Sequence, residues 1–154
     1  MTKPRDYFTG KQEEFKRSEV QIAPYNPRKI SPQQKATLKR SIRKFGVGGI
    51  SVNKPTTTIV GGTQKVTIMD EIMGYPEKDY TLLAEAVNVD YKTEVELNFM
   101  LNSENAHGEW DDMKVRELLP DINYMDAGLT EEDLSLFGYD AMVKTEGEDE
   151  LGKE

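Results

Sequence analysis

The chain has 154 residues, enough for one hydrophobic core, and no cysteine, which excludes disulfides, thiolate metal sites and cysteine nucleophiles. It shows neither an apolar run long enough to cross a bilayer nor the apolar core of a signal peptide, so we expect a soluble, cytoplasmic protein with no membrane partner. The net charge of −8 is uneven: residues 1–54 carry 13 Lys or Arg against 4 Asp or Glu, and residues 55–154 carry 7 against 24. This uneven charge has two interpretations. The basic part could bind nucleic acid, or the basic and acidic parts could attract each other within the fold.

The N-terminal part is predicted to hold an arm, a short strand and a turn before the first helix. Residues 1–18 are polar, and we expect a flexible arm there. Residues 20–22 alternate as in a strand, and two prolines three residues apart then predict an extended turn over residues 23–28. Ser31 and Gln34 have the spacing of a capping box, which predicts that a helix begins between them.

The helix after Ser31 carries five cations between residues 35 and 44, with no acidic residue among them. Three of the cations recur at four-residue spacing, so they share one face of the helix. An ordinary solvated face has the same appearance, but neutralising phosphates is what such clusters do best. We therefore predict a DNA-binding surface that consists of Lys35, Lys39, Arg40, Arg43 and Lys44.

The most informative stretch is residues 58–74, where a β-branched strand leads through two glycines into a helix. Gly61 and Gly62 permit a sharp turn, and Thr63 is predicted to cap the helix. A glycine turn at a helix N-terminus presents N–H groups and the positive end of the helix dipole, which suit a phosphate, and Lys65 adds a charge beside it. The same two glycines can also make a tight connection that binds nothing.

The remaining pattern completes an α+β chain with short C-terminal helices. A strand is expected over residues 82–89, followed by a helix with Thr93 as its cap; Asp111 or Asp112 caps the next helix. We divide the chain into a flexible arm (1–18), a compact domain (19–119), a helical extension (120–143) and a disordered acidic tail (144–154).

The order of these pieces resembles the ParB/sulfiredoxin-like superfamily, in particular the small ParB-like domains of phages and mobile elements. A strand leads to PYNPR and a basic helix ending in FG, a hairpin leads into IVGG, a helix ends in MGYP, and a further strand and helix are followed by LN and GEWD. The resemblance covers residues 20–119. It implies a compact α+β fold with a small mixed sheet and flanking helices.

The resemblance also implies a nucleotide-binding cleft for an NTP, either CTP or ATP, together with Mg²⁺. Lys65 stands where the family typically has arginine in the glycine turn. Glu104 and Asn105 resemble an acidic–Asn pair that positions phosphate or a divalent ion, so we predict both as catalytic and Glu104 as a metal ligand. Asn102 also fits the LN of the smaller members. The predicted nucleotide-binding residues are Asn26, Arg28, Gly61, Gly62, Thr63, Gln64 and Lys65.

We therefore expect a nucleotide-binding ParB-like protein of phage or mobile-element DNA metabolism, with NTP hydrolysis or DNA cleavage as candidate reactions. No arginine follows the Glu104–Asn105 pair at the family distance, which counts against triphosphate hydrolysis. Sulfiredoxin chemistry needs a cysteine in the glycine turn and is excluded. A centromere-binding partition protein is not expected, since the chain lacks room for a helix-turn-helix domain. The alternative is a catalytically degenerate domain that binds a protein partner as a regulator or adaptor.

Overall fold

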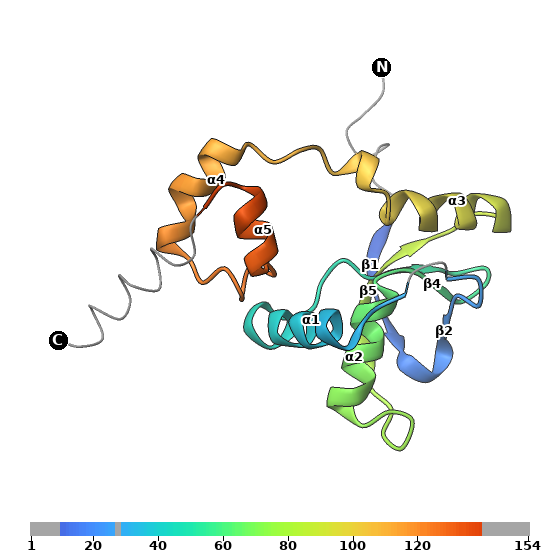
Figure 1. The fold of residues 1–154 in the computed structure, drawn as a ribbon. Helices are drawn as coiled ribbons and strands as arrows, with labels where there is room; N and C mark the ends of the chain where they lie inside the picture. The colour runs from blue at the N-terminus through green and yellow to red at the C-terminus, as the bar shows by residue number, and fades with distance from the viewer. Residues whose placement is uncertain (1–9, 27–28, 140–154) are drawn as a thin grey trace. The chain divides into compact units, whose positions relative to one another are not determined.

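The computed structural model describes residues 10–26 and 29–139 (Figure 1). The chain divides into two units, one ending at His107 and the other beginning at Gly108, and each is described by itself. We had placed the boundary at residue 119. The division falls earlier because Asp111 begins a helix that belongs to the second unit.

The first unit is built on a five-stranded mixed sheet with the order β1-β5-β3-β4-β2. The outer pair β1/β5 and the central pair β3/β4 are antiparallel, whereas β3/β5 and β2/β4 are parallel. The small mixed sheet agrees with the predicted fold class. Its strands are β1 (Lys11–Lys16), β2 (Gln21–Ile22), β3 (Ser51–Asn53), β4 (Thr58–Gly61) and β5 (Thr81–Val87).

Strand β1 lies where the sequence predicted a flexible arm. It pairs with β5 from Lys11 opposite Ala86 to Lys16 opposite Thr81. Phe15 packs against the core, but most of the strand is exposed. An edge strand with one solvated face needs few apolar residues, so its polar sequence resembled that of an unstructured segment.

Three helices and two short 3-10 helices complete this unit: α1 (Pro32–Phe45), α2 (Thr63–Met73), α3 (Tyr91–Leu101), η2 (Arg17–Glu19) and η3 (Glu104–Ala106). The capping box of α1 is confirmed, since Ser31 accepts from the Gln34 amide at 3.0 Å and Gln34 accepts from the Ser31 amide at 2.9 Å. The predicted cap of α3 was wrong by three residues, because Asp90 accepts from the Thr93 amide at 2.8 Å.

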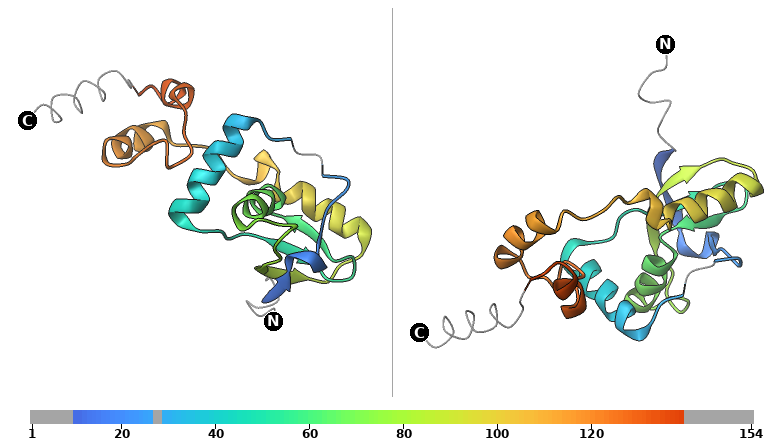
Figure 2. Two further views of the ribbon diagram at one scale, coloured as in Figure 1. Left: turned by 90° about the horizontal axis from the view of Figure 1, so that it is seen from below. Right: turned by 45° about the horizontal axis from the view of Figure 1, so that its top comes forward.

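The two faces of the sheet are covered by different helices, with α2 below the strands and α3 above them in Figure 1. Val52 on β3 faces the apolar core and is fully buried, whereas its neighbour Asn53 points to the opposite side, toward α3. Helix α1 packs beside α2, as the views in Figure 2 show. The core residues are Val20, Ile50, Val52, Ile59, Val66, Tyr80, Leu82 and Ala84.

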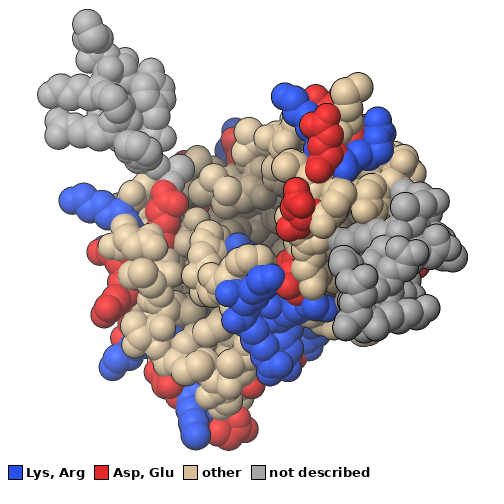
Figure 3. All heavy atoms as spheres, turned by 90° about the vertical axis from the view of Figure 1, so that its left-hand side faces the viewer, with Lys and Arg blue, Asp and Glu red and all other residues tan. Residues whose placement is uncertain are grey.

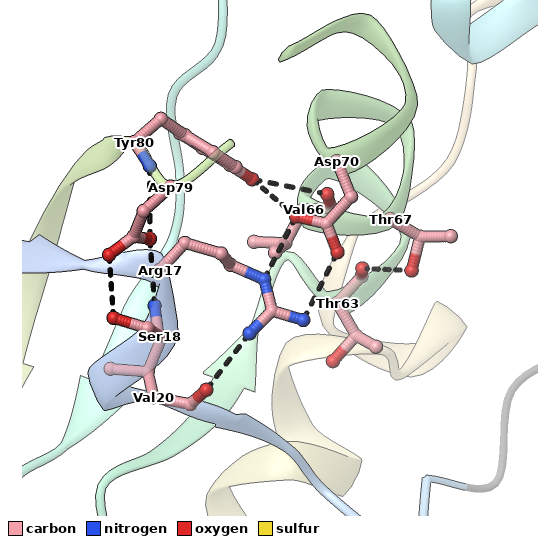
Figure 4. Close-up of polar contacts among 9 residues, drawn as sticks. All are labelled: Arg17, Ser18, Val20, Thr63, Val66, Thr67, Asp70, Asp79 and Tyr80. Carbon is pink, nitrogen blue, oxygen red and sulfur yellow. Dashed lines mark hydrogen bonds and ion pairs between the residues drawn. The ribbon is translucent and has the colours of Figure 1, made fainter. Parts of the chain in front are cut away.

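A buried ion pair fixes α2 to the connection between β1 and β2 (Figure 4). Arg17, which is 7% exposed, donates from Nε and Nη2 to the two carboxylate oxygens of Asp70 at 2.8 and 3.1 Å. The Tyr80 hydroxyl donates to the same carboxylate at 2.6 Å, and the guanidinium lies 4.4 Å from the centre of the Tyr75 ring. The local sequence of α2 gives no signal for this contact, because the partner of Asp70 lies 53 residues earlier in the chain.

The second unit contains α4 (Asp112–Leu118), η4 (Leu119–Asp121) and α5 (Glu131–Leu136). Asp111 caps α4, as predicted. The Trp110 ring meets Phe137 edge-on at 5.8 Å, and Arg116 donates to the Phe137 carbonyl. No helix in the described part of the chain is long and apolar enough to span a bilayer.

Candidate functional site

A pocket of about 410 Å³ opens at the N-terminus of α2. It is bounded by the turn after β2, by α1, by the loop before β3, by the end of β4 and by the end of α3. Its described lining consists of Asn26, Lys29, Ile30, Gln34, Leu38, Gly49, Val60, Gly61, Gly62, Thr63, Gln64, Lys65, Leu101 and Asn102.

The two glycines lie where the chain is crowded, Gly62 by backbone atoms and Gly61 by side chains. Gly62 has φ +81°, and a Cβ there would lie 3.1 Å from the Gly49 carbonyl oxygen. A Cβ on Gly61 would lie 2.9 Å from the side chain of Leu101. Gly62, and not Thr63 as predicted, is the N-cap of α2, because its left-handed conformation ends the strand and leaves Thr63 already helical.

The residues of the first turn of α2, which carry the N-terminal amides of the helix, therefore line the pocket. The first intrahelical bond runs from the Val66 amide to the Gly62 carbonyl at 3.0 Å, so the amides of residues 63–65 precede it. The partial positive charge of the helix is concentrated in these groups. This end of the helix suits an anion.

The Thr63 hydroxyl is a buried polar group without a partner in the described chain. Thr63 is 8% exposed and lines the pocket, and its Oγ1 makes no hydrogen bond. Leaving such a group unsatisfied costs about 1–3 kcal/mol.

The charged side chains that line the described part of the pocket are both cationic. Lys65 donates from Nζ to the Gly48 carbonyl at 2.7 Å, which ties the glycine loop before β3 to the first turn of α2. Lys29, exposed to solvent, supplies the second positive charge. Two cations beside a helix N-terminus favour a negatively charged ligand.

The structure brings together most of the predicted nucleotide-binding residues. Six of them line the pocket, namely Asn26, Gly61, Gly62, Thr63, Gln64 and Lys65, and the seventh, Arg28, lies outside the described residues. What these residues bind stays a prediction at this point.

Of the predicted catalytic pair, Asn105 is not among the described pocket lining, and the side chain of Glu104 lies outside the described part of the structure. Glu104 and Asn105 lie in η3, beyond the end of α3, and Asn105 is exposed. Asn102, the alternative match to the family, lines the pocket and donates from Nδ2 to the Asn98 carbonyl at 2.8 Å. Within residues 10–26 and 29–139, no group of three or more acidic or histidine side chains could hold a metal ion.

Sequence reasoning missed the lining that α1 and the preceding loop contribute. Gln34 was assigned only to the helix cap, and Leu38 only to the apolar stripe. Nothing in the local pattern indicates that this face of α1 also borders the glycine turn, about 25 residues later. The LN dipeptide was the one available signal, and it pointed to Leu101 and Asn102.

The basic residues of α1 form a separate surface. Four of the five predicted DNA-binding residues, Lys39, Arg40, Arg43 and Lys44, border a shallow groove with Ala36. The fifth, Lys35, forms an ion pair with Glu71 of α2. Figure 3 shows Lys and Arg side chains gathered in a patch on one face of the molecule.

Neither a protein-family model nor a curated protein matches the chain. Among solved structures it is similar to the C-terminally truncated chromosome-partitioning protein ParB from Caulobacter crescentus, whose structure is a complex with CTP-γ-S. The TM-score is 0.55 at 19% sequence identity, over 85% of this chain and 73% of that one. The likeness, the mixed sheet and its flanking helices establish that this chain folds as a ParB-like domain.

Proposed function

We propose that this protein binds a nucleoside triphosphate in the pocket at the N-terminus of α2. The observation that carries the proposal is the first turn of α2, where the amides that precede the first intrahelical bond and the side chain of Lys65 border one pocket. The complex of the Caulobacter ParB with CTP-γ-S supports this assignment and makes CTP the first nucleotide to test.

The phosphates would lie at the glycine turn. The amides of the first turn and the Lys65 ammonium are groups of the kind that bind phosphate at helix N-termini. Lys65 would exchange the Gly48 carbonyl for a phosphate oxygen, and Lys29 would add a second charge. Ile30, Leu38 and Leu101 offer apolar contacts to the rest of the ligand, and about 410 Å³ lies within the range of small-molecule sites.

The described residues that line the pocket supply groups that can bind a nucleotide. A reaction catalysed in the pocket is a separate proposal. NTP hydrolysis or DNA cleavage, in the metabolism of phage or mobile-element DNA, follows only from the resemblance. It would require Glu104, whose side chain lies outside the described part of the structure, to act together with Mg²⁺ on a ligand in this pocket. Mg²⁺ bound through the phosphates alone is compatible with the pocket, because this ion usually keeps several water ligands.

Thermal unfolding in the presence of CTP, ATP, GTP or UTP tests the proposal, with and without Mg²⁺. A ligand at about 100 times its Kd stabilises the native state by about 2.7 kcal/mol. For a domain of this size, that free energy raises the Tm by on the order of 10 °C. Lys65→Ala should abolish most of the shift, while the Tm without ligand changes little, because its hydrogen bond to Gly48 is exposed.

The control is Lys78→Ala, which removes the same charge beyond the opposite end of α2, near Gly74. This variant should keep the full ligand-induced shift. If no nucleotide raises the Tm of the wild-type protein, the proposal is overturned and the alternative, a degenerate domain that binds a protein partner, is favoured. An equal loss of the shift in both variants would mean that general charge, and not the pocket, holds the nucleotide.

The basic groove on α1 favours DNA as a second partner. Four cations within six positions of one helix suit contact with successive phosphates. Binding through about four phosphates predicts a slope of about −4 in a plot of log K against log salt. Reversing Lys39 and Arg43 to Glu should abolish retention on DNA at low salt and leave the nucleotide-induced shift intact. Retention that persists in this variant would contradict a role for the groove.

A further inference from the structure

The inward face of α3 is polar, which is the reverse of the usual pattern for a helix packed on a sheet. Glu94 and Asn98 are each 1% exposed, whereas Phe99 and Met100 are 57% and 59% exposed. A buried carboxylate is costly unless it is hydrogen-bonded, so the position of Glu94 calls for an explanation.

Glu94 receives hydrogen bonds from three separate segments. Tyr25, in the turn after β2, donates its hydroxyl to Oε2 at 2.8 Å. Asn53, at the end of β3, donates from Nδ2 to Oε1 at 2.8 Å, and Thr56 in the following turn donates its hydroxyl to the same oxygen. Asn53 also accepts from the Val89 amide and donates to the Val89 carbonyl, both at 3.0 Å. The charge is thus held in a defined place.

This network reaches the pocket through Tyr25. The next residue, Asn26, lines the pocket, and its amide closes a turn on the Ala23 carbonyl at 3.1 Å. Two contacts fix the side chain of Tyr25: its hydroxyl donates a hydrogen bond to Glu94, and its ring packs edge-on against the Tyr91 ring, with 5.9 Å between the ring centres. The path of the chain into the pocket wall is therefore set by the Tyr25–Glu94 contact.

We propose that Glu94 and Tyr25 are positioning residues, which fix the turn that carries Asn26 into the pocket and thereby set its affinity for nucleotide. The inference rests on the proposed function. Stability alone would not require a charge at this position, because well-packed apolar residues of similar volume often stabilise a core equally well. A carboxylate shared by three donors instead holds a loop, a strand end and a turn at fixed distances.

A second tyrosine in the same unit provides a matched control. Tyr80 also donates its hydroxyl to a carboxylate, that of Asp70, at 2.6 Å, and does not line the pocket. Burial, and then the hydrogen bond to the carboxylate, raise the pKa of both phenols. Tyr25→Phe and Tyr80→Phe therefore remove the same kind of bond, one beside the pocket and one away from it.

The experiment measures the Kd for CTP by calorimetry in the wild-type protein and in both variants, with urea unfolding as the measure of stability. We expect both variants to lose stability, and only Tyr25→Phe to raise the Kd, by about 5- to 10-fold. Glu94→Gln should raise the Kd by a similar factor. The double variant should bind CTP no more weakly than the weaker-binding of the two single variants, because each of the three variants disrupts the contact between Tyr25 and Glu94.

The outcomes distinguish this inference from the proposed function. No binding of CTP, ATP, GTP or UTP by the wild-type protein overturns the proposed function and the inference with it. An unchanged Kd in Tyr25→Phe, or the same rise in Tyr80→Phe, overturns the inference alone. If the rise in Kd of the double variant equals the product of the rises in Tyr25→Phe and Glu94→Gln, the two residues do not act through one contact.

Discussion

Gly62 has the conformation on which the geometry of the pocket depends. Gly62 and Gly74 cap the two ends of α2 with nearly the same φ, +81° and +82°. Their surroundings differ, since a Cβ on Gly62 would lie 3.1 Å from the Gly49 carbonyl oxygen, whereas the nearest atom to a Cβ on Gly74 would be Lys78 Cδ at 3.8 Å. Strain and crowding can therefore be separated by comparing the two positions.

We predict that Gly74→Ala lowers the free energy of unfolding by about 1 kcal/mol, the cost of a left-handed alanine. Gly62→Ala should cost about 1–2 kcal/mol more, because the added methyl also crowds backbone atoms. Urea unfolding of the two variants measures both values. Equal costs would mean that the loop at Gly49 moves aside freely, so that Gly62 is required only for its φ.

Glu94 makes a second prediction at the residue scale. Burial alone would raise the pKa of Glu94, but the hydrogen bonds from Thr56, Asn53 and Tyr25 outweigh it and lower the pKa below its usual value. The folded state therefore favours the carboxylate. Its contribution to stability is complete above the unfolded-state pKa of about 4.3 and is lost as the pH falls through the lower, folded-state value.

As the pH falls below about 4.3, the free energy of unfolding of the wild-type protein should thus fall more steeply than that of Glu94→Gln. Exposed carboxylates with lowered pKa values, such as Asp79 and Asp90, are present in both proteins, so their contributions cancel in the comparison. Urea unfolding at a series of pH values gives the two curves. Parallel curves would contradict a hydrogen-bonded, ionised Glu94.

At the scale of elements, α2 is held in place by two ion pairs of different kinds. Arg17–Asp70 is buried and reinforced by Tyr80 (Figure 4), whereas Lys35–Glu71 joins α1 to α2 at the exposed surface. Removing one partner of a buried pair leaves an uncompensated charge, which is costly, while an exposed pair contributes little. The buried pair should therefore dominate.

Arg17→Ala is expected to lower the free energy of unfolding by about 3–5 kcal/mol. Lys35→Ala, the matched loss of an exposed partner, should leave the unfolding curve nearly unchanged. Urea unfolding of both variants decides between these effects. A small loss in Arg17→Ala would mean that water reaches Asp70 and solvates it.

The elements that sequence reasoning predicted well are those with local signals. The capping box at Ser31 and the cap at Asp111 are short patterns, and each lies where it was predicted. The buried face of α3 could not be predicted in this way, because the hydrogen-bond donors for Glu94 lie 38 to 69 residues earlier in the chain.

Strand β1 and the pocket lining were missed for the same physical reason. The partner of β1 is β5, about 70 residues later, and a polar edge strand has no signal of its own. The glycine turn was found because its residues are contiguous. Asn102 at the end of α3 lines the pocket, whereas Asn105 is not among its described lining, and the position of this end of the helix depends on the contact between α3 and β4.

At the scale of the whole molecule, the account depends on an anion at the first turn of α2. The ParB-like fold brings the glycine turn, the first turn of α2 and Lys65 to one pocket, and the basic groove of α1 shares no residue with the lining of that pocket. Nucleotide and DNA would therefore bind at different surfaces, and amide signals along the backbone can report on each separately.

The most direct test is a titration of the ¹⁵N-labelled protein with CTP and Mg²⁺, followed by amide chemical shifts. We predict saturable shifts that are largest at residues 62–65, with smaller ones at Asn26 and Asn102 and little change along the basic groove of α1. Spectra that do not change at millimolar CTP, or shifts confined to α1, would contradict the assignment of this pocket as a nucleotide site.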